Sequence, residues 1–236
     1  MDHRLFDALL TQYVQNGYVD YDGFAKAPEF SRYLGQLNAV RLDGMDEDER
    51  LAFWINVYNA YTIQLIVLHR ETESIRQINK SLGVLRLKGP WSEPIVHAAG
   101  RTLSLDDVHH RILRKEYAEP RVHFVLVCAA MGCPPLRSEA YTGAALVDQL
   151  NEQAKQFLRE SPTKTRLEKN RLFISPILMA YRNDFGASRD DLARSIAPWF
   201  DGEARKRLER GRVFFEATAF DWTLNSVAKA KALGLL

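Results

Sequence analysis

The chain is poor in cysteine and nearly balanced in charge. Its 236 residues include two cysteines, and the small excess of basic residues leaves a net charge of +2. Two cysteines exclude the disulfide framework that holds small secreted domains together, although they leave room for one bridge. A charge this small argues against nucleic acid or an anionic membrane as the partner.

Long apolar runs and glycine-rich loops are also missing. No apolar run approaches the roughly 20 residues that span a bilayer, so we expect no membrane insertion. Met1 to Arg4 lack the apolar core of a signal peptide, which predicts a cytoplasmic chain. A periplasmic or exported location is the alternative if a leader has been removed. Without a phosphate loop, a nucleotide-binding fingerprint or a Gly-x-Ser-x-Gly elbow, we expect no cofactor.

What remains is helical periodicity interrupted by isolated strands. Between Asp46 and His69 the apolar residues occupy nearly every direction around a helix axis, which predicts a buried central helix. No linker or internal repeat divides the chain, so we predict a single domain over residues 1–236. The mixture favours an α+β fold in which the central helix packs on a small mixed or antiparallel sheet with helices around it. Other predicted helices cover Leu5–Tyr13, Pro28–Leu37, Leu105–Arg114, Thr142–Arg159, a segment from Pro176, Asp190–Phe200 and Glu203–Arg210.

Both cysteines lie at the end of a short apolar run. Arg121–Cys128 is nearly continuous in apolar residues, which predicts a strand covered on both faces. In a regular strand His123 lies on the face opposite Cys128, so the two are not expected to pair. Cys133 follows five positions later in a Gly/Pro turn, where a thiol is easier to reach. Cys128 is the preferred reactive thiol and Cys133 its rival; packing in the core is the alternative for both.

A thiol nucleophile needs an imidazole and a group that fixes the ring. Ser104 and Asp107 form a capping-box pattern that starts a helix, and on that helix His109 points to the core while His110 lies on the flank. His110 is therefore the preferred base. Backbone N–H groups of the turn 129–132 are candidates for holding an oxyanion.

The third group has several candidates. Asn56 and Asn59 lie on one side of the central helix. A buried amide either satisfies a neighbouring backbone or orients an imidazole. Asn59 or Asn56 is preferred for the orienting role, and Asp221 is an outside candidate.

Two other kinds of site use the same residues. Structural zinc prefers cysteines two to four residues apart and a second ligand pair. Here four residues intervene between Cys128 and Cys133, and adjacent histidines on a helix diverge by about 100°. We therefore expect no metal. A redox role for the two cysteines stays open, with His123 as a further candidate.

Four motifs, in order along the chain, resemble those of the bacterial and plant family called domain of unknown function 547. They are Phe53–Ala60, Leu103–Arg114, His123–Pro134 and Phe220–Asn225. The resemblance runs from about Leu5 to Asn225 and implies that Asn56, Asn59, His110 and Cys128 belong to the family's pattern. His109 stands where the family usually has Glu. The family's name assigns no activity, and kinship with papain-like or transglutaminase-like thiol folds is an analogy.

The best prediction of function is a thiol-dependent hydrolase or acyltransferase with a Cys–His–Asn or Cys–His–Asp site. It would act on an amide, ester or thioester carbonyl. The alternative is a non-catalytic scaffold or binding domain that uses the same cleft. In both cases we expect the partner to be a small molecule or a peptide.

Overall fold

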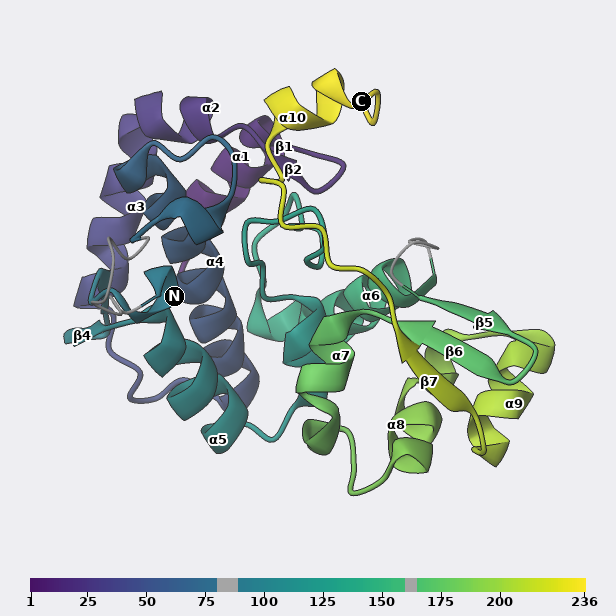
Figure 1. Cartoon of the computed structure of the whole chain (residues 1–236). Coiled ribbons are helices and arrows are strands. Elements are labelled where there is room, and N and C mark those ends of the chain that lie inside the picture. Colours follow the sequence, from purple (N-terminus) through teal and green to yellow (C-terminus); the bar gives the residue numbers. More distant parts are fainter. Residues whose placement is uncertain (80–88, 160–164) are drawn as a thin grey trace, which may run out of the picture.

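The computed structural model describes residues 1–79, 89–159 and 165–236, and within them the predicted α+β architecture is confirmed (Figure 1). This part of the chain combines helices with three small sheets. The helices are α1 Arg4–Tyr13, α2 Tyr21–Lys26, α3 Pro28–Ala39, α4 Glu47–His69, α5 Arg114–Glu116, α6 Leu146–Arg159, α7 Pro176–Ala180, α8 Arg189–Ile196, α9 Gly202–Arg210 and α10 Val227–Ala232. The strands are β1 Val14–Gln15, β2 Tyr18–Val19, β3 Val96–Ala98, β4 Arg101–Leu103, β5 Arg166–Glu168, β6 Arg171–Ile174 and β7 Phe214–Ala217.

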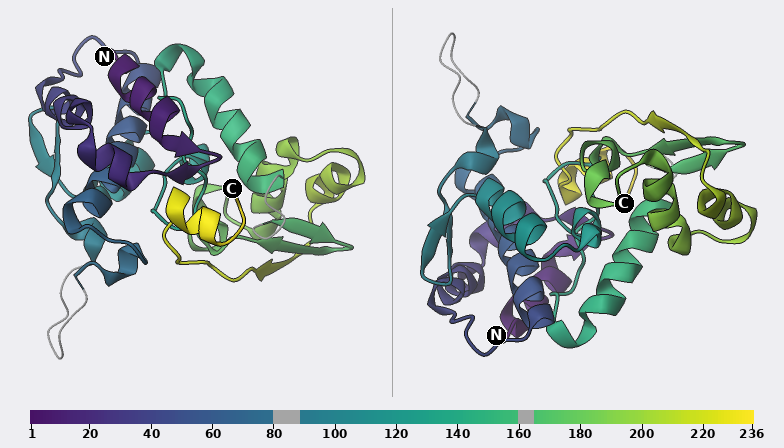
Figure 2. Two further views of the ribbon diagram at one scale, coloured as in Figure 1. Left: turned by 90° about the horizontal axis from the view of Figure 1, so that it is seen from above. Right: turned by 90° about the horizontal axis from the view of Figure 1, so that it is seen from below.

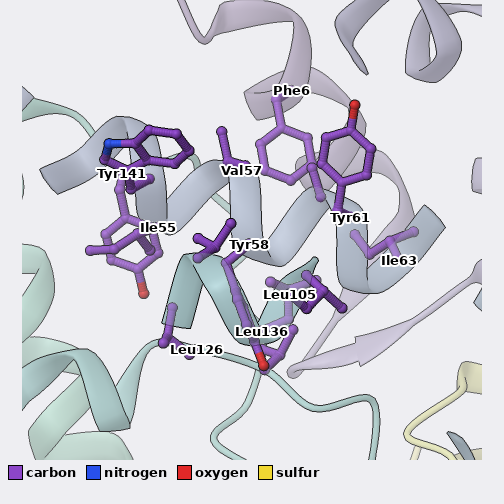
Figure 3. Packing of buried hydrophobic residues seen from close by; sticks show 14 of the residues in the cluster. Phe6, Ile55, Val57, Tyr58, Tyr61, Ile63, Leu105, Leu126, Leu136 and Tyr141 are labelled. Carbon is purple, nitrogen blue, oxygen red and sulfur yellow. The ribbon is translucent and has the colours of Figure 1, made fainter. Parts of the chain in front are cut away.

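Helix α4 is the predicted central helix. It begins at a capping box, in which Asp46 accepts from the Glu49 N–H and Glu49 accepts from the Asp46 N–H. From Leu51 to Ile66 nearly every residue is buried, as Figure 3 shows for part of this core. The helix is long and apolar enough to cross a membrane, but 83% of its most apolar window is buried inside the protein. It is the core helix of this fold.

The buried residues form two hydrophobic clusters that meet along α6. The first surrounds α4 and includes α1, α3, the β3–β4 hairpin and Leu150 near the start of α6. The second lies between α6, α7, α8 and β6, and Phe157 near the end of α6 belongs to it. Figure 2 shows α6 running from one region to the other. The space between the two clusters holds the candidate site.

The predicted small mixed sheet is found, but it belongs to the second cluster. Strand β6 pairs antiparallel with β5 and parallel with β7. The antiparallel β3–β4 hairpin, by contrast, packs with α4 in the first cluster. The α4 helix is therefore covered mainly by other helices and by this hairpin.

The strand predicted at Arg121–Cys128 is wrong. A 3₁₀ helix covers Pro120–Phe124, and the backbone from there to Cys128 is irregular. The helical turn starts at Pro120 and is capped by Glu119, whose side chain accepts from the Arg121 N–H. A short apolar run does not distinguish a buried strand from a buried helical segment, because both are covered on all sides.

Candidate functional site

A cavity of about 490 Å³ lies between the two clusters. Its volume is in the range of small-molecule sites. The cavity is lined by Tyr58, Trp91, Asp106, His109, His110, His123, Leu126, Cys128, Pro176, Ile177, Ala180, Tyr181, Phe220 and Trp222. The cavity is mostly apolar, and one cysteine and three histidines line it. These four residues come from two separate segments of the chain.

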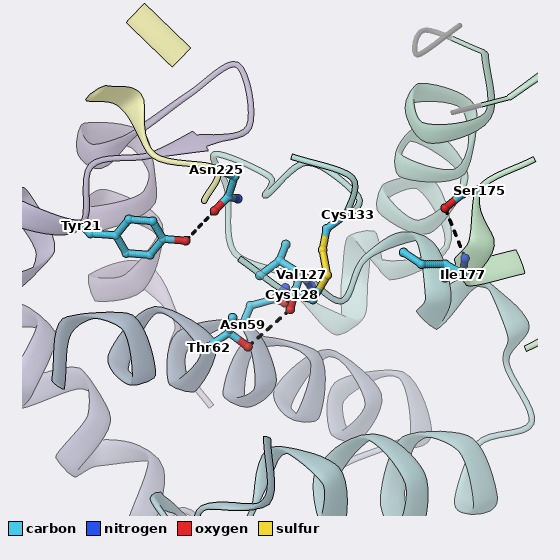
Figure 4. The surroundings of a disulfide bond; sticks show 9 residues. All are labelled: Tyr21, Asn59, Thr62, Val127, Cys128, Cys133, Ser175, Ile177 and Asn225. Carbon is cyan, nitrogen blue, oxygen red and sulfur yellow. Dashed lines mark hydrogen bonds between the residues drawn. A yellow bond between two sulfur atoms is a disulfide. The ribbon is translucent and has the colours of Figure 1, made fainter. Parts of the chain in front are cut away.

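The two cysteines form a disulfide, with their Cα atoms 5.8 Å apart (Figure 4). Cys128 is partly exposed and lines the cavity, whereas Cys133 is 1% exposed. The expectation that Cys133 is the easier thiol to reach is therefore wrong. The C-terminal segment that follows β7 contacts the same turn at Met131 and Gly132.

Backbone hydrogen bonds hold that C-terminal segment to the cysteine turn. Met131 donates to the carbonyl of Thr223 and Gly132 to that of Asp221, both at 2.8 Å. A Cβ on Gly132 would lie 3.0 Å from backbone atoms of Asp221, so only glycine fits without displacing the segment. Two of the amides expected to hold an oxyanion, those of Met131 and Gly132, are thus engaged in this contact.

Asn56 and Asn59 both bond to neighbouring backbone. Asn59 donates to the Val125 carbonyl at 3.0 Å and accepts from the Val127 N–H at 3.1 Å. Asn56 makes the same pair of bonds with the Tyr141 carbonyl and N–H, at 2.7 and 3.0 Å. The backbone-bridging alternative accounts for both side chains, and neither residue lines the cavity. Asn59 instead fixes the irregular segment that leads to Cys128.

Asp221 lies outside the cavity that contains Cys128. Its side chain is exposed and accepts from the Thr223 N–H at 2.9 Å. It lines a separate, open groove that also contains Arg76. The structure therefore does not bring Asp221 to the cavity that His109, His110 and His123 line.

A stretch of π-helix, Asp107–Leu113, turns two adjacent histidines toward the cavity. The predicted capping contacts of Ser104 and Asp107 precede it, with the Asp107 N–H donating to the serine hydroxyl at 3.0 Å. The rings of His109 and His110 stack with centroids 4.4 Å apart. Stretches of π-helix are rare and occur frequently at functional sites, and the sequence pattern predicted only an ordinary helix here.

His110 is the more exposed of the two histidines, as expected, but both of its ring nitrogens have neighbours. Its Nδ1 lies 3.2 Å from Nη1 of Arg114, and its Nε2 lies 3.9 Å from a carboxylate oxygen of Asp106. A guanidinium only donates, so Nδ1 accepts and Nε2 carries the proton. In this arrangement His110 has no lone pair left to take a proton from a thiol.

His123 has the contacts expected of an oriented base. Its Nε2 donates to the Asp184 carboxylate at 2.7 Å, and its ring stacks on Tyr181 with centroids 4.3 Å apart. The Arg114 guanidinium donates two hydrogen bonds to the same carboxylate, at 2.6 and 2.7 Å. Donation from Nε2 leaves the lone pair on Nδ1. Because the segment is not a strand, the argument that separated His123 from Cys128 fails, and both line one cavity.

The electrostatics of this network keep the imidazole neutral. The Arg114 guanidinium lowers the pKa of Asp184 to about 2. Burial lowers the pKa of His123 to about 4, although the carboxylate opposes the shift. At neutral pH Asp184 is therefore ionised and His123 is an uncharged base. Sequence reasoning missed Asp184 because it lies 61 positions from its histidine partner.

Within the described ranges, no group of three or more His, Cys, Asp and Glu side chains is placed to hold a metal ion. The three histidines of the cavity contact one another through their ring faces and edges instead. His109 lies with its ring centroid 5.6 Å from that of His123 and 5.1 Å from that of Tyr181.

Acid is expected to destabilise the fold below about pH 6.5. Burial lowers the pKa of His123 from 6.5 to about 4 and that of His109 to about 2, whereas the unfolded chain regains the ordinary value. The unfolded state then binds protons that the folded state does not, so the free energy of unfolding falls as the pH drops toward 4. We expect a loss of several kcal/mol, since one pKa unit corresponds to about 1.4 kcal/mol.

Urea unfolding at pH 7, 5.5 and 4 measures this loss. His109→Phe removes one of the groups and should flatten the profile. Equal stability at all three pH values would contradict the assignment of neutral, buried imidazoles.

Residues 42–158 match the model of one protein family, described as protein of unknown function, DUF547. The match covers α4, the π-helix and the cysteine turn, together with most of α6. No curated protein and no solved structure matches the chain.

Proposed function

We propose that this chain, which belongs to the DUF547 family, is a thiol-dependent hydrolase or acyltransferase that acts on an amide, ester or thioester. Cys128 is the nucleophile, His123 the general base and Asp184 the carboxylate that orients it. The observation that carries the proposal is that Cys128 and the Asp184-bound His123 line the same cavity.

Neutral His123 suits the role of base. Its Nδ1 lone pair takes the proton of the thiol while Asp184 holds the other side of the ring, which fixes the tautomer. The bidentate bond to Arg114 keeps the carboxylate in place and ionised. His110, which the sequence favoured, faces Arg114 and Asp106 instead.

The reaction starts from the reduced form. A low-molecular-weight dithiol reduces the Cys128–Cys133 bond and is itself oxidised to its disulfide, which leaves two thiols on the protein. His123 then takes the proton of Cys128, the sulfur attacks the carbonyl carbon, and the leaving group departs with that proton. Water, or another acceptor nucleophile, attacks the resulting thioester and restores the thiol.

The disulfide itself favours a second candidate, a dithiol–disulfide exchange function. Exchange proceeds by attack at an accessible sulfur, and here one partner lines a cavity while the other is buried. In this case the cavity would hold the polypeptide or small thiol that exchanges with Cys128, and no acyl group would be transferred.

A matched pair of cysteine variants tests the proposal. With a panel of p-nitrophenyl esters, aryl thioesters and anilides, wild type should be active only after reduction. Cys133→Ser should be active without reductant, because its Cys128 thiol is free. Cys128→Ser should lose about 1,000-fold or more in kcat/KM, as when a triad member is removed.

Two results would refute the proposal that the protein is a thiol-dependent hydrolase or acyltransferase. One is turnover that survives in Cys128→Ser. The other is a protein that hydrolyses nothing in the panel but whose cysteines equilibrate with a glutathione buffer at a defined potential, which would favour the exchange function.

A further inference from the structure

His109, one of the residues that line the cavity, has a buried ring nitrogen without a hydrogen-bond partner among the described residues. His109 is 9% exposed, and its Nε2 is one of the buried side-chain atoms in the described ranges that make no hydrogen bond. Leaving such an atom unsatisfied costs about 1–3 kcal/mol. Buried polar groups without partners are uncommon in folded proteins and call for a physical reason.

The surroundings of His109 explain why the protein itself does not satisfy this atom. Its ring lies among other rings: His110 at 4.4 Å, Tyr181 at 5.1 Å and Tyr58 at 5.9 Å between centroids. These neighbours fix the ring's position by stacking and edge contacts. His109 is also one of the residues that line the cavity.

The rest of the wall indicates which chemistry the ligand has. Trp91, Phe220 and Trp222 form an aromatic wall, with ring centroids 6.3 Å apart for the two tryptophans and 4.4 Å for Phe220 and Trp222. The carboxylate of Asp106 stands at the rim. The guanidinium of Arg114 is engaged by Asp184. An aromatic or apolar group fits this wall, whereas an anion would meet a carboxylate and, among the described residues that line the cavity, no unpaired cation.

We infer that His109 is a specificity-determining residue, and that the cavity takes an uncharged aromatic or apolar group carrying one hydroxyl or amide that hydrogen-bonds to His109 Nε2. A hydroxyl or an amide satisfies this nitrogen in either tautomer, because each of them both donates and accepts. As a statement about the substrate this inference rests on the proposed function. As a statement about binding it rests on the cavity alone.

Equilibrium dialysis of oxidised wild type with 2-naphthol, naphthalene and 2-naphthoate tests the inference. The first two probes differ by one hydroxyl, and the third carries a negative charge. We expect 2-naphthol to bind about 5- to 150-fold more tightly than naphthalene, which is the range set by satisfying one buried polar atom at about 1–3 kcal/mol. The naphthoate should bind more weakly than the naphthol.

Two variants separate the polar contact from the aromatic wall. His109→Phe should bind naphthalene within about threefold of wild type and lose the preference for 2-naphthol. Trp222→Ala should weaken both probes equally. Equal binding of the two probes to wild type, or a preference that persists in His109→Phe, overturns the inference.

A measurement on wild type covers the case in which His109→Phe does not fold. The ¹⁵N shift of His109 Nε2 should move on saturation with 2-naphthol and stay unchanged with naphthalene. If neither probe moves it, the inference is wrong.

All of these binding measurements use the oxidised protein, so their outcome does not depend on thiol catalysis. A preference without turnover would refute only the proposed function, and turnover by Cys133→Ser without a preference would refute only this inference.

Discussion

Replacing Asn59 by alanine is expected to lower the free energy of unfolding by about 2–6 kcal/mol, because two buried backbone groups lose their partners at about 1–3 kcal/mol each. Those groups are the Val125 carbonyl and the Val127 N–H, both of which the amide now satisfies. They belong to the irregular segment that leads to Cys128. Urea unfolding of oxidised wild type and variant measures the difference.

Asn56→Ala is the matched control. It removes the same pair of bonds from the same helix, but to Tyr141 rather than to the segment before Cys128. Both variants should be destabilised, whereas the rate at which a dithiol reduces the Cys128–Cys133 bond should rise only in Asn59→Ala. A loss below about 1 kcal/mol in Asn59→Ala would mean that water replaces the amide and that it does not fix the segment.

Asp184→Asn is expected to lower the activity of the reduced protein by about 100- to 10,000-fold, the usual range for losing an effective general base. Arg114 Nε and His123 Nε2 bond to the same oxygen, Oδ2, while Arg114 Nη2 bonds to Oδ1. An amide has one acceptor oxygen, so at either position its NH₂ group meets an N–H donor and one of these bonds is lost. The neutral amide also no longer stabilises the imidazolium that forms when His123 takes the thiol proton. The readout is kcat/KM with the best substrate of the ester, thioester and anilide panel.

Asp106→Asn is the control, because it changes a carboxylate that lines the cavity and lies near the other candidate base, His110. Asp106 lies 3.9 Å from His110 and does not bond to His123. We expect its activity to stay within about threefold of wild type. If Asp106→Asn proves the more damaging of the two, His110 is the base and the roles given to His123 and Asp184 are wrong.

Local patterns predicted much of this fold. The buried α4 and the capping contact before the π-helix were predicted from side chains within a few positions of one another. The spacing of Asn56 and Asn59 predicted that both amides lie in the core. Hydrogen bonding to a neighbouring backbone was one of the two roles predicted for them. The segment before Cys128 was mispredicted because its backbone bonds to an Asn59 side chain 66 and 68 positions away instead of to a neighbouring strand.

The site was harder to predict for the same reason. The parity argument that excluded His123 depended on a strand that does not form. Asp184 has no local motif, and its role appears only when α7 and the turn after it pack beside the π-helix. The cysteine turn bonds to the C-terminal segment, which reaches it from some 90 positions further along the chain. Contacts between distant segments are not encoded in the spacing of any one of them.

The most direct test of the Cys128–His123 pair is the rate of iodoacetamide alkylation against pH in Cys133→Ser, with and without His123→Ala or His110→Ala. The neutral imidazole of His123 should take the thiol proton during attack, so Cys128 should be alkylated at neutral pH faster than an unassisted thiol with the ordinary pKa of about 8.5. His123→Ala should remove this rate advantage, and His110→Ala should leave it. An advantage that disappears with His110 and survives without His123, or a thiol that stays inert until the protein unfolds, would contradict the pair.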